Sequence, residues 1–203
     1  MIRFGSIFLI SLIVVACASS PRVSRTFEDT GFNGTFENLL VVGVANNYSR
    51  RAEFERAVVS RLNGLGVTAT AYYTVVPGND SLTKDSVVRA IESGGFDGLL
   101  LTRIVSQGTS ANLQSGSSTV TATRRHDRPF DFFRYDYDVL TDPDVINVSR
   151  EGILATELYS ARDKRMVWGI DTAASVESNV SATVEQIADA ITGQLDRDGL
   201  LGR

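Results

Sequence analysis

Side chains that could perform chemistry are few in this sequence. It contains one cysteine, Cys17, and one histidine, His126. A zinc site needs several imidazole or thiolate ligands, which one residue of each type cannot supply. A Ser–His–Asp triad would have to use His126, which stands in a charged segment typical of a turn, and no Gly-x-Ser-x-Gly elbow is present to expose a nucleophile. We therefore expect no catalytic residues, no metal site and no enzyme activity.

Motifs for cofactors are also missing. The sequence has no Walker Gly-Lys-Ser/Thr, and Gly64 and Gly66 fall at the end of a predicted helix, where they form no phosphate cradle. The densest acidic cluster lacks the glycine and the terminal glutamate of an EF-hand and is typical of a solvated strand edge and turn. Its members are Asp136, Asp138, Asp142 and Asp144. We expect no cofactor.

The context of Cys17 indicates an exported protein. Arg3 precedes an apolar run over residues 4–16, which is shorter than the about 20 residues of a membrane-spanning helix. A basic start, a short apolar run and a small residue before the cleavage point describe a secretory signal. The run ends in Val14-Val15-Ala16-Cys17, which resembles the bacterial lipobox. We predict that residues 1–16 are a lipoprotein signal peptide and that Cys17 becomes the lipidated first residue.

Lipidation at Cys17 would place the protein at a membrane. Each buried CH₂ contributes about 0.8 kcal/mol, so two or three acyl chains hold far more firmly than one. Residue 18 is Ala rather than Asp, which in bacteria with two membranes implies sorting to the outer membrane, and we expect the domain to face the periplasm. Residues 17–37 are rich in Ser, Thr, Asn and Gly and predict a lipidated flexible tether.

Composition limits the classes of partner. The formal net charge of the whole chain is −4. Removal of residues 1–16 removes Arg3 and leaves 19 basic and 24 acidic residues, a net charge of −5. Nucleic-acid affinity depends on neutralising phosphates, so we expect no nucleic-acid partner. The mature chain has no cysteine besides Cys17, so no disulfide within it supports the fold.

The first half of the predicted domain alternates strands and helices. Residues 39–45 form a continuous apolar run, as in a strand of a parallel sheet that is buried on both faces. Asn46-Asn47-Tyr48-Ser49 then offers turn and N-cap residues for an amphipathic helix, which Gly64 and Gly66 are suited to end. A strand follows over 67–76, then a helix that Ser81 or Thr83 caps and Gly94-Gly95 ends, and a strand over 96–105. Two right-handed crossovers and a parallel core are expected.

The second half has a different pattern. We expect an exposed loop over 106–118, an edge strand over 119–123 and a half-exposed strand over 133–139. Residues 153–160 and 166–173 predict an antiparallel hairpin that contains Trp168, and a helix follows over 180–195, capped by Asn179 or Ser181 and closed near Gly199. The fold class is α/β with a mixed sheet, in one domain over residues 38–203.

This order of elements resembles a group of small bacterial envelope lipoproteins, mostly of unknown function, whose α/β domain is similar to the N-terminal domain of the Tol-system β-propeller protein. The residues that carry the resemblance are Leu39–Ala45, Gly94–Leu100 and the hairpin from Glu157 to Trp168. The resemblance implies a fold and an envelope setting. It implies no catalytic residues.

Two surfaces are candidates for binding. Backbone N–H groups of Tyr48–Arg51 begin a helix just past the first strand, where open α/β sheets bind ligands and anions; Arg50 and Arg51 are equally typical of exposed helix residues. The aromatic segment Phe130–Tyr137 follows Arg124, Arg125 and Arg128, a composition found at interfaces and also in edge strands that avoid pairing.

The leading hypothesis is a non-catalytic envelope lipoprotein that binds or scaffolds a protein partner at the outer membrane. The alternative is a ligand-binding module for an anion or a cell-wall fragment at the carboxyl end of the first parallel strand. An enzyme ranks third, and no role is assigned to residues 106–149.

Overall fold

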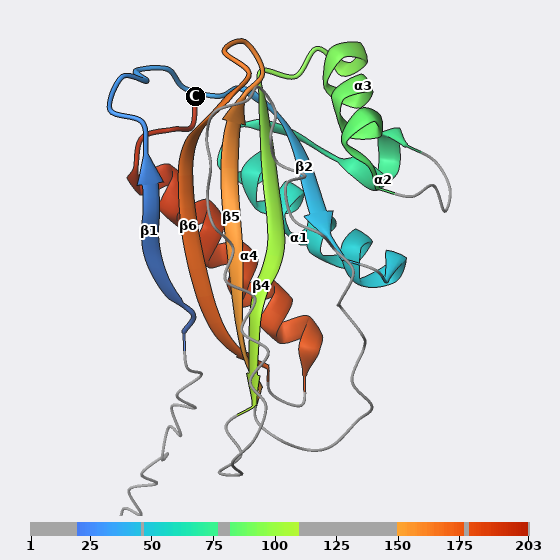
Figure 1. The fold of residues 1–203 in the computed structure, drawn as a ribbon, viewed down its shortest axis with the longest axis vertical. Helices are drawn as coiled ribbons and strands as arrows, with labels where there is room; N and C mark the ends of the chain where they lie inside the picture. Colours follow the sequence, from blue (N-terminus) through green and yellow to red (C-terminus); the bar gives the residue numbers. More distant parts are fainter. Residues whose placement is uncertain (1–19, 46, 77–81, 110–149, 177–178, 203) are drawn as a thin grey trace, which may run out of the picture.

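The computed structural model describes residues 20–45, 47–76, 82–109, 150–176 and 179–202. These residues form a mixed sheet in the order β1-β6-β5-β4-β2-β3, with helices on both of its faces (Figure 1). The strands are β1 (Arg22–Glu28), β2 (Asn38–Val44), β3 (Thr68–Ala71), β4 (Gly98–Thr109), β5 (Arg150–Ser160) and β6 (Arg165–Val176). The helices are α1 (Tyr48–Gly64), α2 (Tyr72–Val75), α3 (Lys84–Gly94) and α4 (Val180–Arg197).

The parallel core is as predicted. β2 pairs in parallel with β3 on one side and with β4 on the other. Successive side chains of a strand point to opposite faces, so Leu39 and Val41 pack with α1 and α4, whereas Leu40 and Val42 pack with α2 and α3. A strand that is buried on both faces needs apolar residues at every position, which explains the continuous run that the sequence shows.

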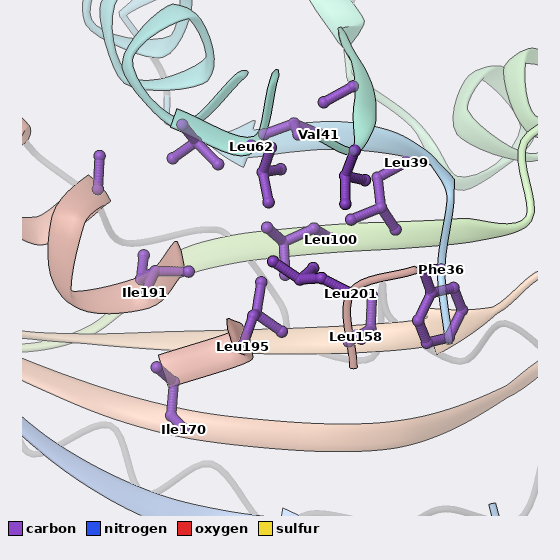
Figure 2. Packing of buried hydrophobic residues seen from close by; sticks show 14 of the residues in the cluster. Phe36, Leu39, Val41, Leu62, Leu100, Leu158, Ile170, Ile191, Leu195 and Leu201 are labelled. Atoms are coloured by element: carbon purple, nitrogen blue, oxygen red, sulfur yellow. The ribbon is translucent and has the colours of Figure 1, made fainter. Parts of the chain in front are cut away.

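The antiparallel half is also confirmed. β5 pairs with β4 and with β6, and β5 and β6 form the expected hairpin. Trp168 of β6 is 1% exposed and belongs to the larger apolar cluster between the sheet, α1 and α4. Figure 2 shows side chains of this cluster, in which Leu195 and Ile191 of α4 face Leu100 of β4 and Ile170 of β6.

The helix boundaries follow the predicted signals. Asn47 caps α1, Thr83 caps α3 and Asn179 caps α4, each through a side-chain oxygen that accepts a backbone N–H of the first turn. Gly95 ends α3 with a φ of 64°, in the left-handed region that glycine tolerates. None of the helices in the described part of the chain is long and apolar enough to cross a membrane.

The structure corrects the boundary of the predicted tether. Residues 22–28, which we assigned to the flexible segment 17–37, form β1 and pair antiparallel with β6. The pairing shifts register between Arg25 and Phe27, so Val23 reaches the α1/α4 side of the sheet and Phe27 reaches the α2/α3 side. Phe36, from the end of the same segment, is 2% exposed. The Ser- and Thr-rich composition does not predict the strand, because its pairing partner β6 lies far away in the sequence.

Two further predictions were wrong in detail. The strand expected over 67–76 ends at Ala71, and Tyr72 begins the short helix α2, because the Tyr73 N–H donates to a side chain of α1 rather than to a neighbouring strand. The loop expected from residue 106 begins later, since β4 continues to Thr109 beside β5 after a bulge between Ile104 and Ser106. The strands expected over 119–123 and 133–139 lie outside the described residues.

Candidate functional site

The candidate site lies where β2 and β3 end. From β2 the chain passes into α1, which covers one face of the sheet, and from β3 it passes into α2 and α3, which cover the other face (Figure 1). Open α/β sheets hold ligands outside the carboxyl ends of their parallel strands. We call the residues at this point the switch cluster: Gly43, Tyr48, Arg51, Glu55, Tyr72 and Tyr73.

Arg51 is buried between two aromatic rings. It is 6% exposed, and its guanidinium carbon lies 5.3 Å from the ring centroid of Tyr48 and 5.8 Å from that of Tyr72. Cation–π contacts of this kind stabilise a cation by about 0.5–2 kcal/mol. They do not use its N–H groups, and the Nε atom has no hydrogen-bond partner among the residues described. The first turns of α1 and α2 therefore enclose a cation with an unused donor.

Glu55 lies one helical turn after Arg51 and is completely buried. One carboxylate oxygen accepts the Gly43 N–H at 3.0 Å, and the other accepts the Tyr73 N–H at 2.9 Å. The side chain thus ties the end of β2 to the first turn of α2. Burial raises the pKa of Glu55 to about 7, against the lowering effects of its backbone hydrogen bonds and of the nearby Arg51 charge.

The outer surface of the switch cluster is aromatic and basic. Tyr48 and Val75 are the exposed large hydrophobic residues of the described part of the chain, at 39% and 41%. The ring of Tyr73 meets that of Tyr48 edge-on at 6.5 Å between centroids. Arg50 projects into solvent and pairs with Glu53 at 3.4 Å. A ligand at this point would meet arginine side chains and two tyrosine rings.

The sequence located this site in part. Tyr48–Arg51 do begin a helix at the carboxyl end of the first parallel strand, as predicted, but the Asn47 side chain accepts the Arg50 N–H. Arg50 is exposed and Arg51 is buried, although the two arginines look equivalent in the sequence. Glu55 and Tyr72 were missed. The only signal was the unusual position of Glu55 on the apolar stripe of α1, beside Phe54 and Val58.

A second buried polar group connects β4 and β5. Arg103 and Glu157 form a two-point ion pair at 2.8 and 2.9 Å, with both side chains 4% exposed, and the Tyr159 hydroxyl donates to Glu157 at 2.7 Å. A buried pair of this type costs desolvation energy and is strongly destabilising when only one member is removed. Its carboxylate is engaged by two donors, so we assign it a structural role.

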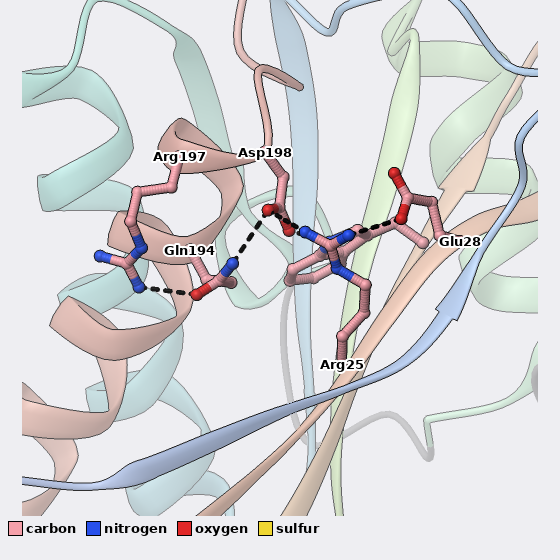
Figure 3. A network of polar contacts seen from close by, with 6 residues as sticks. Arg25, Glu28, Gln194, Arg197 and Asp198 are labelled. Atoms are coloured by element: carbon pink, nitrogen blue, oxygen red, sulfur yellow. Dashed lines mark hydrogen bonds and ion pairs between the residues drawn. The ribbon is translucent and has the colours of Figure 1, made fainter.

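A third group fixes β1 to the end of α4 (Figure 3). The Asp198 carboxylate accepts the Trp168 indole N–H at 2.7 Å and the Gln194 amide at 2.9 Å, and it also pairs with Arg25. Arg25 contacts Glu28 within β1 as well. This group connects three elements that meet only in the folded chain, and it too is structural.

The other candidate residues of the sequence lie outside the described residues. These are the lipidation site Cys17, His126, the acidic cluster at 136–144 and the aromatic segment 130–137. Within the described ranges, His, Cys, Asp and Glu side chains form no group of three that could hold a metal ion.

Comparison with known proteins supports the fold and leaves the family open. No protein-family model and no curated protein matches the sequence. Among solved structures, the PelC dodecamer from Paraburkholderia phytofirmans is similar with a TM-score of 0.51 at 8% identity, over 90% of this chain and 99% of that chain. Lipoprotein GNA1162 from Neisseria meningitidis gives 0.43 at 11% identity, over 79% and 98% of the two chains. A minor lipoprotein from Acinetobacter baumannii gives 0.34 at 11%, over 82% and 97%.

At these identities the likeness to PelC shows a shared mixed α/β fold and no more. The neighbours include bacterial lipoproteins, whereas the expected similarity to the Tol-system protein is not shown.

Proposed function

We propose that this chain is a non-catalytic lipoprotein of the bacterial envelope, anchored in the outer membrane through Cys17, whose domain faces the periplasm and binds or scaffolds a protein partner. The lipobox supports the anchor, Ala18 supports sorting to the outer membrane, and the position of β1 supports the role in holding a partner. β1 begins at Arg22, so four residues separate it from Cys17. An extended chain covers about 18 Å between Cys17 and Arg22. A lipid on Cys17 would hold the start of β1 close to the membrane surface.

A short link favours a role in holding a partner at a defined height above the membrane. β1 pairs with β6 along its length, and Arg25 binds the end of α4 through Asp198. The four residues after a lipidated Cys17 would therefore lead directly into a strand of the sheet. A non-catalytic role is consistent with the use of Glu55 and Glu157, the buried carboxylates described above, which accept hydrogen bonds from the fold itself.

The anchor is tested by substitution of Cys17. In cells grown with labelled palmitate, the wild-type chain should incorporate label, whereas Cys17→Ser should incorporate none and should accumulate as the unprocessed precursor. Ala18→Asp is the matched variant, because it should keep the label but leave the protein in the inner membrane fraction. Normal labelling of the Cys17→Ser chain would rule out the anchor, and an Ala18→Asp chain that still fractionates with the outer membrane would contradict the sorting.

The partner is tested by crosslinking in intact cells. We expect one envelope protein to be captured reproducibly with the wild-type chain. Capture should fall when a flexible Gly/Ser segment is inserted between Pro21 and Arg22, because the insert leaves lipid and domain intact but no longer fixes the distance of the domain from the membrane. PelC is described as a dodecamer, so the mass of the detergent-solubilised complex should also be measured to separate copies of this chain from a different partner. A monomer that is repeatedly captured alone would refute partner binding.

A further inference from the structure

The first turn of α1 is unfavourable for the isolated protein. Arg50 and Arg51 occupy this turn, which contains no acidic residue. The N-terminus of a helix carries a partial positive charge, so each cation there costs about 0.3–1 kcal/mol, and an anion is favoured instead. Burial of Arg51 beside this end adds to the cost. Local violations of this kind are found at functional sites, where a ligand supplies the missing interaction.

Arg51 itself indicates the missing interaction. Its side chain is more than nine-tenths buried, it points between the starts of α1 and α2, and Nε has no hydrogen-bond partner in the described structure. The neighbouring Glu55 directs its two oxygens to the Gly43 and Tyr73 N–H groups. A guanidinium presents parallel N–H donors that match the oxygens of carboxylate and phosphate groups.

We propose that the switch cluster binds an oxyanion, a carboxylate or a phosphate ester attached to an apolar body, with Arg51 as its central donor. The oxyanion lies at the N-terminus of α1 and accepts from the Arg51 guanidinium. The apolar body packs on the exposed Tyr48 ring and on the Tyr73 ring that meets it edge-on. The Tyr48 ring covers Arg51, and it stands 39% exposed on the first residue of the helix. Rotation of this ring opens the guanidinium to the ligand. The binding site itself uses no property of the lipid anchor, and only the choice between ligand sources rests on the anchor of the proposed function.

The position of the cluster brings two sources of such a ligand within reach. Strand pairing aligns Val44 of β2, through Arg103, Ala155 and Asp171, with Ser24 of β1. The cluster is therefore level with the start of β1, where the lipid on Cys17 would hold the sheet to the membrane. The oxyanion is thus supplied by a lipid headgroup or by a free solute.

The test uses the full chain in detergent solution. The Nε–H of Arg51 gives its own signal in ¹⁵N-correlated NMR spectra, so binding is read at the proposed atom in the unchanged protein. The probes are phenyl phosphate, inorganic phosphate and a short-chain phosphatidylglycerol below its micelle concentration. We expect phenyl phosphate to shift this signal saturably, together with the amides of Tyr48 and Ser49, and to bind more tightly than inorganic phosphate. If phosphatidylglycerol binds more tightly than phenyl phosphate, the source of the oxyanion is a lipid headgroup. If it binds more weakly, the source is a free solute.

Variants separate a specific site from general charge attraction. Arg51→Lys keeps the charge but loses the forked donor. It should weaken the binding of phenyl phosphate by about tenfold or more, which is the equivalent of one charge-assisted hydrogen bond. Arg50→Ala removes an exposed charge from the same turn and should weaken binding much less. Tyr48→Ala should still bind inorganic phosphate, but it should no longer bind phenyl phosphate more tightly than inorganic phosphate. Equal effects of the two arginine variants, or an Arg51 Nε–H signal that no probe shifts, would overturn the proposal, and both results are independent of whether Cys17 is lipidated.

Discussion

At the scale of single residues, two carboxylates, Glu55 and Asp198, accept hydrogen bonds from several elements of the fold. Glu55 has no contact with solvent, and burial raises its pKa to about 7 against the lowering effects of its backbone hydrogen bonds and of the Arg51 charge. Asp198 is held by donors from β1, β6 and α4. Both side chains connect elements, so their effects should be measurable in stability.

Glu55 should make the protein less stable as the pH rises. Its pKa is 4.5 when unfolded and about 7 when folded, so the folded state binds the proton more tightly. The stabilising contribution is complete below pH 4.5 and is lost as the pH rises through 7, which amounts to about 3 kcal/mol. Denaturant unfolding at several pH values should show this slope in the wild-type chain and a much smaller slope in Glu55→Gln.

Glu53→Gln is the matched control for Glu55, because Glu53 lies on the same helix, is only partly buried and pairs with Arg50. It should keep the wild-type slope. The same pH dependence in the Glu55→Gln and wild-type chains would show that Glu55 titrates normally in the folded protein.

Asp198 should contribute more to the free energy of unfolding than a carboxylate on the surface. Asp198→Asn turns one acceptor oxygen into a donor that faces the Trp168 or Gln194 N–H, and an unsatisfied buried donor costs about 1–3 kcal/mol. Urea unfolding followed by Trp168 fluorescence should show this loss. Asp189→Asn removes a partner of Arg61 whose side chain is 66% exposed, and it should cost less than about 1 kcal/mol. Equal losses in the two variants would mean that the Asp198 contacts add nothing in solution.

At the scale of elements, the short segment between α3 and β4 also holds the amino end of β2. The Asp97 carboxylate accepts the N–H groups of Glu37 and Asn38 at 2.7 and 3.0 Å, and Gly98 then passes directly under the ring of Phe36. Residues 95–98 therefore hold the amino ends of the parallel strands β2 and β4 together. The two glycines of this segment are needed for different reasons. Gly95 adopts a positive φ, and Gly98 leaves room for the Phe36 ring.

Gly98→Ala tests this approach. A Cβ at residue 98 would lie 2.5 Å from an atom of the Phe36 ring and 2.8 Å from Leu39, and overpacking of this kind costs about 1–3 kcal/mol. Gly64→Ala is the control, because a Cβ there meets nothing within 4 Å and the residue is helical, so the change should stabilise by up to about 1 kcal/mol. Thermal unfolding should give melting temperatures that move in opposite directions. A wild-type melting temperature for Gly98→Ala would show that Phe36 moves aside without cost.

At the scale of the molecule, β2 and β4 are shared by the two apolar clusters. Leu39, Val41 and Leu100 belong to the cluster under α1 and α4, and Leu40 and Leu101 belong to the cluster under α2 and α3. Neither layer can lose its helices without exposing the strands that support the other. We therefore expect one cooperative unfolding transition, in which Trp168 fluorescence and far-ultraviolet circular dichroism coincide. Two separated transitions would show that the layers unfold independently.

The elements that the sequence predicted well are those with local causes. The continuous run at Leu39–Ala45, the capping residues Asn47, Thr83 and Asn179, and the glycine at the end of α3 follow from the residue types and their nearest neighbours along the chain. The same local information led to the hairpin of β5 and β6, since both strands and their turn are contiguous.

What the sequence could not provide were features that depend on distant partners. β1 is a strand because β6 and Asp198, more than a hundred residues away, supply its hydrogen bonds and its ion pair. α2 interrupts a segment of strand-forming residues because Glu55 of α1 receives the Tyr73 N–H. In both cases local preference was weak and a tertiary contact decided the outcome.

For the function, the sequence by itself determined the candidate lipid site at Cys17, the shortage of catalytic side chains and the α/β order of elements. Each of these depends only on residue types and on neighbours along the chain. The tertiary structure alone decided that Arg51 and Arg50 are unlike, and that Glu55, Tyr48 and Tyr72 surround the former. The physical reason is that the first turns of α1 and α2 meet beyond the ends of β2 and β3, where Tyr48 and Tyr72 bury Arg51 and leave the adjacent Arg50 in water.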